Sequence, residues 1–147
     1  MKALIFVVSL AMIGTVTEAQ LKRMIGTIQP SEAIEKTLDG CACRLSSASL
    51  ENGFVVVSTM DGERAWMMLS GKLTELSMTK TTESETHGTS FLREYQSPAY
   101  SVTVSIVRAK SQAKAQGESE GYSIVAQITV RKGNMVEEVS AAGSCGC

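Results

Sequence analysis

The sequence predicts an all-β domain: an antiparallel meander of seven or eight strands that forms a sandwich or a small barrel, with its termini tied by disulfides. Three observations lead to this fold class. Apolar and polar residues alternate over most of the chain from position 41 onward, which is the period of a half-buried strand. Turn-forming glycine dipeptides separate the alternating runs. Two matching triplets, Cys41-Ala42-Cys43 and Cys145-Gly146-Cys147, bracket all of these runs.

Composition narrows the classes of function. The 147 residues suit one domain, and 44% apolar residues with 20% charged residues are typical of a globular protein. A net charge of -1 offers no electrostatic basis for binding nucleic acid or an anionic membrane surface. A protein partner, a small molecule or a structural role stays open, and the oligomeric state is not indicated.

The first residues have the pattern of a signal peptide over positions 1–19. Lys2 precedes an apolar run that ends near Val16, and Thr17-Glu18-Ala19 supplies small residues for cleavage after Ala19. The run is shorter than the roughly 20 residues of a membrane-spanning helix, so we expect no stable membrane insertion. Export to a bacterial periplasm or the extracellular space follows. In such an oxidising compartment, four cysteines predict two disulfides.

Positions 20–40 are expected to form a leader before a single β domain at 41–147. The leader has no alternating pattern. Pro30 to Leu38 could form about two helical turns that stop at Asp39-Gly40, provided that the apolar side chains pack on something. The alternative is a mobile leader.

The first half of the domain reads as four strands joined by tight turns. Asp61-Gly62 predicts a type I′ hairpin turn, in which both central residues need a positive φ. Asn52-Gly53 and Gly71-Lys72 mark further turns. The strands expected here span 41–45, 54–60, 63–70 and 73–79.

The second half contains the clearest alternation. Tyr100, Val102, Val104 and Ile106 face one way, and Ser101, Thr103 and Ser105 face the other. The polar stretches 80–88 and 108–121 are expected to be loops whose roles the sequence does not indicate, and Arg131 to Asn134 a turn. The strands expected in this half span 89–96, 100–106, 122–130 and 135–142.

The cysteine triplets allow three pairings. Residues two apart in a strand share a face, so antiparallel first and last strands would pair Cys41 with Cys147 and Cys43 with Cys145. Parallel strands would exchange these partners. Bonds within each triplet are least favoured, because strand residues two apart are separated by roughly 6.5 Å between Cα atoms. A Cys₄ site for Zn²⁺ or Cu(I) is an alternative use, but structural zinc sites usually space their cysteines as Cys-x₂-Cys.

The sequence contains few candidate catalytic side chains, and we expect no catalytic residue, metal ligand or cofactor. His87 is the single histidine and stands in a polar stretch without an evident partner. No nucleophile, phosphate-loop or metalloprotease motif occurs in the sequence. The chain is therefore predicted not to be an enzyme.

One set of side chains could form a binding surface. Arg64, Trp66 and Met68 alternate with apolar residues and so share one face of their predicted strand. Aromatic, Met and Arg side chains are enriched in protein interfaces. The competing interpretation is that Trp66, the only tryptophan, anchors the core.

Two resemblances arise from these motifs. The chain resembles uncharacterised exported bacterial β-proteins with paired Cys-x-Cys motifs. The resemblance rests on the signal peptide, Asp39-Gly40-Cys41-Ala42-Cys43, Ala65-Trp66-Met67, Gly71-Lys72 and the terminal Gly143 to Cys147. That family implies no activity. Ala65 to Leu76 is similar to the hairpin of the periplasmic C-type lysozyme inhibitors, which are closed β-barrels, whereas their inhibitory Ser-Gly-x-x-Tyr stretch is not matched.

The leading hypothesis is an exported, non-enzymatic β domain with a structural or protein-binding role. It predicts an exposed apolar patch or a sheet edge that a partner can reach. A periplasmic inhibitor or small-ligand-binding barrel is one alternative. A Cys₄ metal-binding protein is the other.

Overall fold

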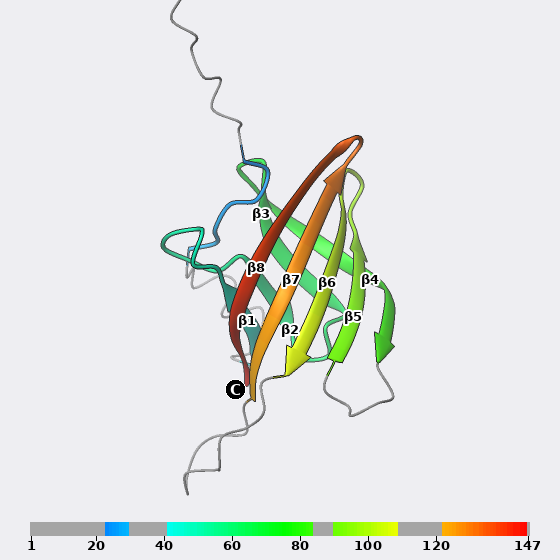
Figure 1. The fold of residues 1–147 in the computed structure, drawn as a ribbon. Helices are drawn as coiled ribbons and strands as arrows, with labels where there is room; N and C mark the ends of the chain where they lie inside the picture. The colour runs from blue at the N-terminus through cyan, green and yellow to red at the C-terminus, as the bar shows by residue number, and fades with distance from the viewer. Residues whose placement is uncertain (1–22, 30–40, 84–89, 109–121, 147) are drawn as a thin grey trace, which may run out of the picture.

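The computed structural model describes residues 23–29, 41–83, 90–108 and 122–146. Eight antiparallel strands form a closed barrel in which each strand pairs with the next and β8 returns to β1 (Figure 1). The predicted all-β meander is thus confirmed, in its barrel form. The strands are β1 (Ala42–Ser46), β2 (Val56–Thr59), β3 (Arg64–Leu69), β4 (Lys72–Glu83), β5 (Ser90–Gln96), β6 (Ser101–Arg108), β7 (Tyr122–Lys132) and β8 (Met135–Gly146).

The inside of the barrel is a packed core. In β6 and β7 the predicted alternation holds: Val102 and Ile128 face inward and are buried, while Ser105 and Gln127 face outward. Side chains of β3, β4 and β7 that are less than 2% exposed fill the interior, as small barrels require. They include Met67, Leu69, Leu76, Ile128 and Val130. Across the described ranges, no helix is long and apolar enough to cross a membrane.

The barrel closes where β1 meets β8. The register runs from Ala42 opposite Gly146 to Ser46 opposite Ala142. Here β8 continues to Gly146, so the predicted strand end at residue 142 was wrong. Gly143 explains the extension, because a Cβ built there would lie 1.8 Å from the carbonyl oxygen of Arg44. Only glycine lets the two backbones approach this closely.

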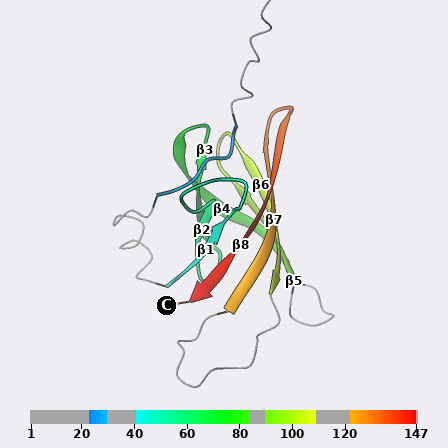
Figure 2. The ribbon, with the colours of Figure 1, turned by 60° about the vertical axis from the view of Figure 1, so that its left-hand side comes forward.

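Residues 23–29 lie against the barrel wall at the end that carries the β3–β4 and β7–β8 turns, called the upper end below (Figure 2). Ile25 forms an isolated bridge with Leu69, and Ile28 forms one with Phe54. The Gly26 N–H also donates to the Met68 carbonyl at 2.8 Å. This segment, taken from the sequence as part of a leader, contributes buried side chains to the domain. The predicted helix within 30–38 and the signal peptide at 1–19 lie outside the described residues.

The residues that adopt a positive φ in the turns differ from those that the sequence predicts. At Asp61-Gly62 only Gly62 has a positive φ, of 76°, so the expected type I′ turn there was wrong. The two positive φ values of that turn type occur instead at Ser70 (50°) and Gly71 (78°), which join β3 to β4. Gly133, with a φ of 57°, takes the first position of the two-residue turn between β7 and β8.

Strand β4 is longer than its composition suggests. Residues 80–83, expected to belong to a loop, extend β4 and pair with β5 up to Glu83 opposite Phe91. A register shift between Met78 and Lys80 precedes this extension. Because residues 80–83 are exposed, they need no apolar alternation, and the ladder to β5 holds them in the strand. Positions 84–89 and 109–121 lie outside the described residues.

Candidate functional site

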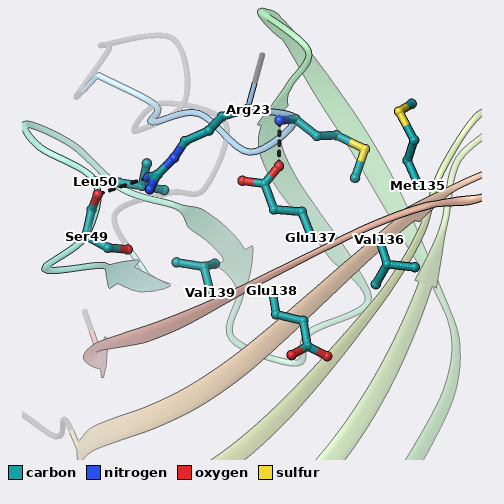
Figure 3. A pocket seen from close by; sticks show the side chains of 9 residues that line it. Arg23, Ser49, Leu50, Met135, Val136, Glu137, Glu138 and Val139 are labelled. Carbon is teal, nitrogen blue, oxygen red and sulfur yellow. Dashed lines mark hydrogen bonds between the residues drawn. The ribbon is translucent and has the colours of Figure 1, made fainter. Parts of the chain in front are cut away.

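A groove of about 420 Å³ opens at the upper end of the barrel (Figure 3). Three separate pieces of the chain form its walls: the segment 23–29, the loop after β1 and the beginning of β8. We call it the upper groove. Its lining residues are Arg23, Met24, Ser49, Leu50, Met135, Val136, Glu137, Glu138 and Val139.

Glu137 holds one wall of the upper groove in place. Its Oε2 atom accepts the backbone N–H of Met24 at 2.6 Å, a bond drawn in Figure 3, and also that of Ile25 at 3.2 Å. On the opposite side, the guanidinium of Arg23 donates to the Ser49 carbonyl at 3.1 Å. A carboxylate that accepts two backbone N–H groups makes strong, charge-assisted hydrogen bonds. The segment 23–29 is therefore fixed to both β8 and the β1–β2 loop.

The groove has an apolar rim and a slightly acidic lining. Met135 is 58% exposed and Val136 50%, where β8 leaves its turn. The lining carries one guanidinium, from Arg23, and two carboxylates, from Glu137 and Glu138. Within the described part of the chain, both hydrogen bonds to Glu137 use Oε2, so Oε1 can still accept a donor.

The chemistry of this lining suits binding. Glu137 and Glu138 are neighbours on β8, but their side chains point to different sides of the strand (Figure 3). They cannot act together as a general acid and base on one substrate atom, which needs both within hydrogen-bond reach. The Ser49 hydroxyl bonds to that of Ser47 at 2.9 Å. An apolar hollow with a few polar groups is typical of a recognition site.

The predicted surface of Arg64, Trp66 and Met68 does share the outer face of β3, but other side chains cover its centre. Trp66 is 8% exposed and belongs to a small cluster with Ile28, Ala42 and Val57, outside the main core. Phe54 and Met68 pack against this cluster. The guanidinium carbon of Arg64 lies 5.5 Å from the centre of the indole. In this structure Trp66 anchors the segment 23–29 to the barrel.

The cysteines link β1 to β8 near the opposite end of the barrel, called the lower end below. Cys43 and Cys145 form a disulfide between β1 and β8, with their Cα atoms 3.9 Å apart. Cys41 is also disulfide-bonded, and its predicted partner, Cys147, lies outside the described residues. Thiolates of Cys43 and Cys145 are thereby unavailable to a metal ion. In the described ranges, no three His, Cys, Asp or Glu side chains gather as a metal site.

A second exposed surface covers the outer face of β5 to β8. Strand register places Leu92 beside Ser105 and Gln127, and Val107 beside Val125 and Ala142. Val107 and Val125 are about half exposed, at 51% and 53%. None of these six side chains carries a charge. We call this set the uncharged face.

Sequence reasoning missed the upper groove. Its residues come from three distant stretches, so no local motif marks them. One signal was available: Met135-Val136 places two consecutive apolar residues directly after a turn, where alternation predicts one outward polar residue. His87 lies outside the described residues.

Comparisons with protein-family models, with curated protein sequences and with solved structures give no match for this chain.

Proposed function

We propose that the protein is an exported, non-enzymatic binding domain whose upper groove receives an apolar side chain of a protein partner. The observation that carries the proposal is the hollow of about 420 Å³ beside the half-exposed Met135 and Val136. Apolar hollows that carry a few polar groups are the usual form of a binding site.

The lining also suggests the chemistry of the partner. The Glu137 carboxylate lines the groove, and both of its hydrogen bonds from described residues use Oε2, so Oε1 can accept a donor from a partner. A partner segment with a Leu, Met or Phe next to a Lys or Arg matches this pattern of an apolar hollow and an acidic lining. Burying one such apolar side chain contributes about 1.5–3 kcal/mol.

The packed interior favours the outside of the barrel over the lumen as the binding surface. Met67, Leu76, Ile128 and Val130 occupy the positions that a ligand would need in a lipocalin-like barrel. A small-ligand barrel is thus less well supported than a surface that binds a protein.

Export is part of the proposal. The disulfide between Cys43 and Cys145 is compatible with an oxidising compartment. Expression of the full chain in a bacterium, followed by fractionation and mass measurement, tests this part. We expect a periplasmic product that begins at Gln20. An uncleaved product in the cytoplasm would contradict export.

Selection of a displayed random-peptide library on the folded protein tests the groove. We expect enriched peptides to carry a large apolar residue next to a basic one. Met135→Glu should abolish their binding, because Met135 lies on the same side of β8 as Glu137 and the change places a charge on the apolar rim. Val125→Glu, a similarly exposed change on the uncharged face, should leave binding within about twofold.

Two outcomes of this selection would contradict the proposal. One is enrichment no better than on an empty support. The other is a set of peptides whose binding Val125→Glu removes and Met135→Glu does not. In that case the uncharged face would be the binding surface.

A periplasmic lysozyme inhibitor is the second candidate function. It is supported by the closed barrel and by the hairpin of β3 and β4, which includes the stretch similar to those inhibitors. Its test is an assay of C-type lysozyme activity with increasing protein. Inhibition that saturates at a one-to-one ratio is expected, and unchanged lysozyme activity at excess protein removes this candidate.

A further inference from the structure

Two arginines and two aromatic residues meet on the inner side of the barrel near its lower end. Alternation in β5, β6 and β7 turns Phe91, Arg93, Arg108 and Tyr122 inward, on the same faces as buried core residues. Phe91 and Tyr122 pack against the main core. We call these four residues the lower-end cluster.

The guanidinium of Arg108 lies close to two aromatic rings. Its guanidinium carbon lies 4.2 Å from the centre of the Tyr122 ring and 5.0 Å from that of Phe91. The rings cover guanidinium faces, but a guanidinium donates hydrogen bonds through its edge. The Nε atom of Arg108 is buried and has no hydrogen-bond partner among the residues that the structure describes. A buried donor without an acceptor is costly, so this N–H marks a place where an acceptor is missing.

Arg93 adds a second positive charge to the cluster. Its guanidinium carbon lies 6.0 Å from the centre of the Phe91 ring, on the same ring that Arg108 contacts. Arg93 also packs against Gly62 and interacts electrostatically with Asp61. The Asp61 carboxylate partly balances Arg93, while Arg108 has no comparable counterion among the described residues.

The described carboxylates do not neutralise Arg108. The two ion pairs found in the described ranges are Arg64 with Glu75 and Lys80 with Glu94, all on exposed side chains. Glu83 lies opposite Phe91 in the register, but it is exposed and belongs to neither pair. Two like charges near one ring therefore leave a positive field that an anion would relieve.

We propose that the lower-end cluster is a binding site for a small oxyanion group, a carboxylate or a phosphate. Arg108 would donate from its edge to the anion, Tyr122 and Phe91 would hold the guanidinium plane, and Arg93 would add attraction from its position beside Phe91. Arginine pairs with these planar or tetrahedral anions through more than one N–H at once. The site is separate from the upper groove and does not depend on the proposed function.

The test is an NMR titration of the full mature chain with sodium phosphate and, separately, with sodium acetate. Sodium chloride keeps the ionic strength constant, so general screening does not change. We expect a saturable shift of the Arg108 Nε–H and Tyr122 ring resonances with at least one anion. A response to phosphate alone or acetate alone would identify which group the site prefers.

Variants locate the response. Arg108→Gln should weaken anion binding at least tenfold, because it removes the charge and the guanidinium edge. Arg131→Gln removes an exposed arginine on the outer side of β7 and should leave the titration unchanged. If Arg108→Gln does not fold, the titration of the unmodified protein still decides, because the buried Nε–H resonance must shift.

An adventitious ion only is the outcome that overturns the proposal. It would give shifts that rise linearly without saturation, or shifts that are equal in the parent protein and in Arg108→Gln. The absence of any shift at the Arg108 Nε–H with both anions would overturn it as well.

Discussion

Glu137 both stabilises the fold and lines the proposed binding site. Its carboxylate accepts the N–H groups of Met24 and Ile25 and at the same time lines the upper groove. Its neighbour Glu138 points to the other side of β8, where it accepts the Thr129 hydroxyl at 3.4 Å. The two adjacent carboxylates therefore have different partners, because successive side chains of a strand point to opposite sides.

The comparison of these two glutamates is the first prediction. Glu137→Ala should lower the free energy of unfolding by about 1–3 kcal/mol, because two partly buried N–H groups lose a charged acceptor. Glu138→Ala should change the free energy of unfolding by less than about 0.5 kcal/mol. Urea denaturation followed by Trp66 fluorescence measures both. Equal effects of the two changes would contradict the role given to Glu137.

Asp61 gives the fold a small dependence on pH. A hydrogen bond from the Thr59 hydroxyl, and then one from the Glu63 N–H, lowers the pKa of Asp61 below its ordinary value of 3.8. A carboxyl with a lowered folded-state pKa adds stability above its unfolded-state pKa, and that stability is lost as pH falls through the folded-state pKa. The contribution is therefore fully present well above pH 3.8 and is lost progressively as the pH falls from 3.8 through the lowered pKa of Asp61.

The second prediction follows from the loss of the Asp61 contribution to stability at low pH. Asp61→Asn should lower the free energy of unfolding at pH 6 by no more than about 1 kcal/mol, because the group is exposed to solvent. Its curve of stability against pH should be flatter than that of the parent protein below about pH 4. Urea denaturation at a series of pH values measures both curves. Parallel curves throughout the acid range would show that Asp61 makes no such contribution.

At the scale of elements, the residue types in a turn predict its backbone conformation only in part. Ser70-Gly71 adopts the type I′ geometry that Asp-Gly sequences favour, with a serine in the left-handed region. Asp61 instead uses its side chain to bind Thr59 and the Glu63 N–H, and only Gly62 takes a positive φ. Side-chain hydrogen bonds of this kind are a common reason for Asp in turns.

The two glycines provide the third prediction. Gly62 and Gly71 have nearly equal φ values, 76° and 78°. A Cβ at Gly62 would lie 2.2 Å from Arg93 Nη1, whereas no atom of the described residues would lie within 4 Å of a Cβ at Gly71. Gly71→Ala should cost about 1–2 kcal/mol for the left-handed backbone alone. Gly62→Ala should cost more, because Arg93 must also move. In an Arg93→Ala background the two costs should become equal; a persistent difference would place its cause elsewhere.

Strong alternation is what made some strands predictable. β6 and β7 have one buried and one wet face, so period-two sequences marked them clearly. The end of β4 and the segment 23–29 could not be predicted in this way. Residues 80–83 are in a strand because β5 pairs with them, and residues 23–29 are placed by bridges to Phe54 and Leu69. Pairing with distant residues overrides local composition in both cases.

At the scale of the molecule, the barrel has two chemically different ends. The upper end carries the groove, its apolar rim and its acidic lining. The lower end carries the Cys43–Cys145 disulfide and the lower-end cluster of Phe91, Arg93, Arg108 and Tyr122. The cysteine latch could be predicted because each Cys-x-Cys puts two thiols on one strand face. The groove could not, because it requires the relative placement of three distant chain segments.

Closure of the sheet between β1 and β8 is the central claim, since it defines both ends of the barrel. A bond between β1 and β8 closes a loop of 102 residues, which in the chain-entropy model is worth about 4.7 kcal/mol. With a second bond close by, either one should hold the barrel shut. The register with Cys43 opposite Cys145 is the feature that a chemical measurement can test.

Thiol counting on two paired variants tests that register, as the fourth prediction. Cys41→Ser with Cys147→Ser should fold and contain no free thiol, because Cys43 and Cys145 still bond. Cys41→Ser with Cys145→Ser should contain two free thiols, because the remaining cysteines are not partners. The opposite pattern, with free thiols in the first variant and none in the second, would contradict the antiparallel closure of β1 on β8.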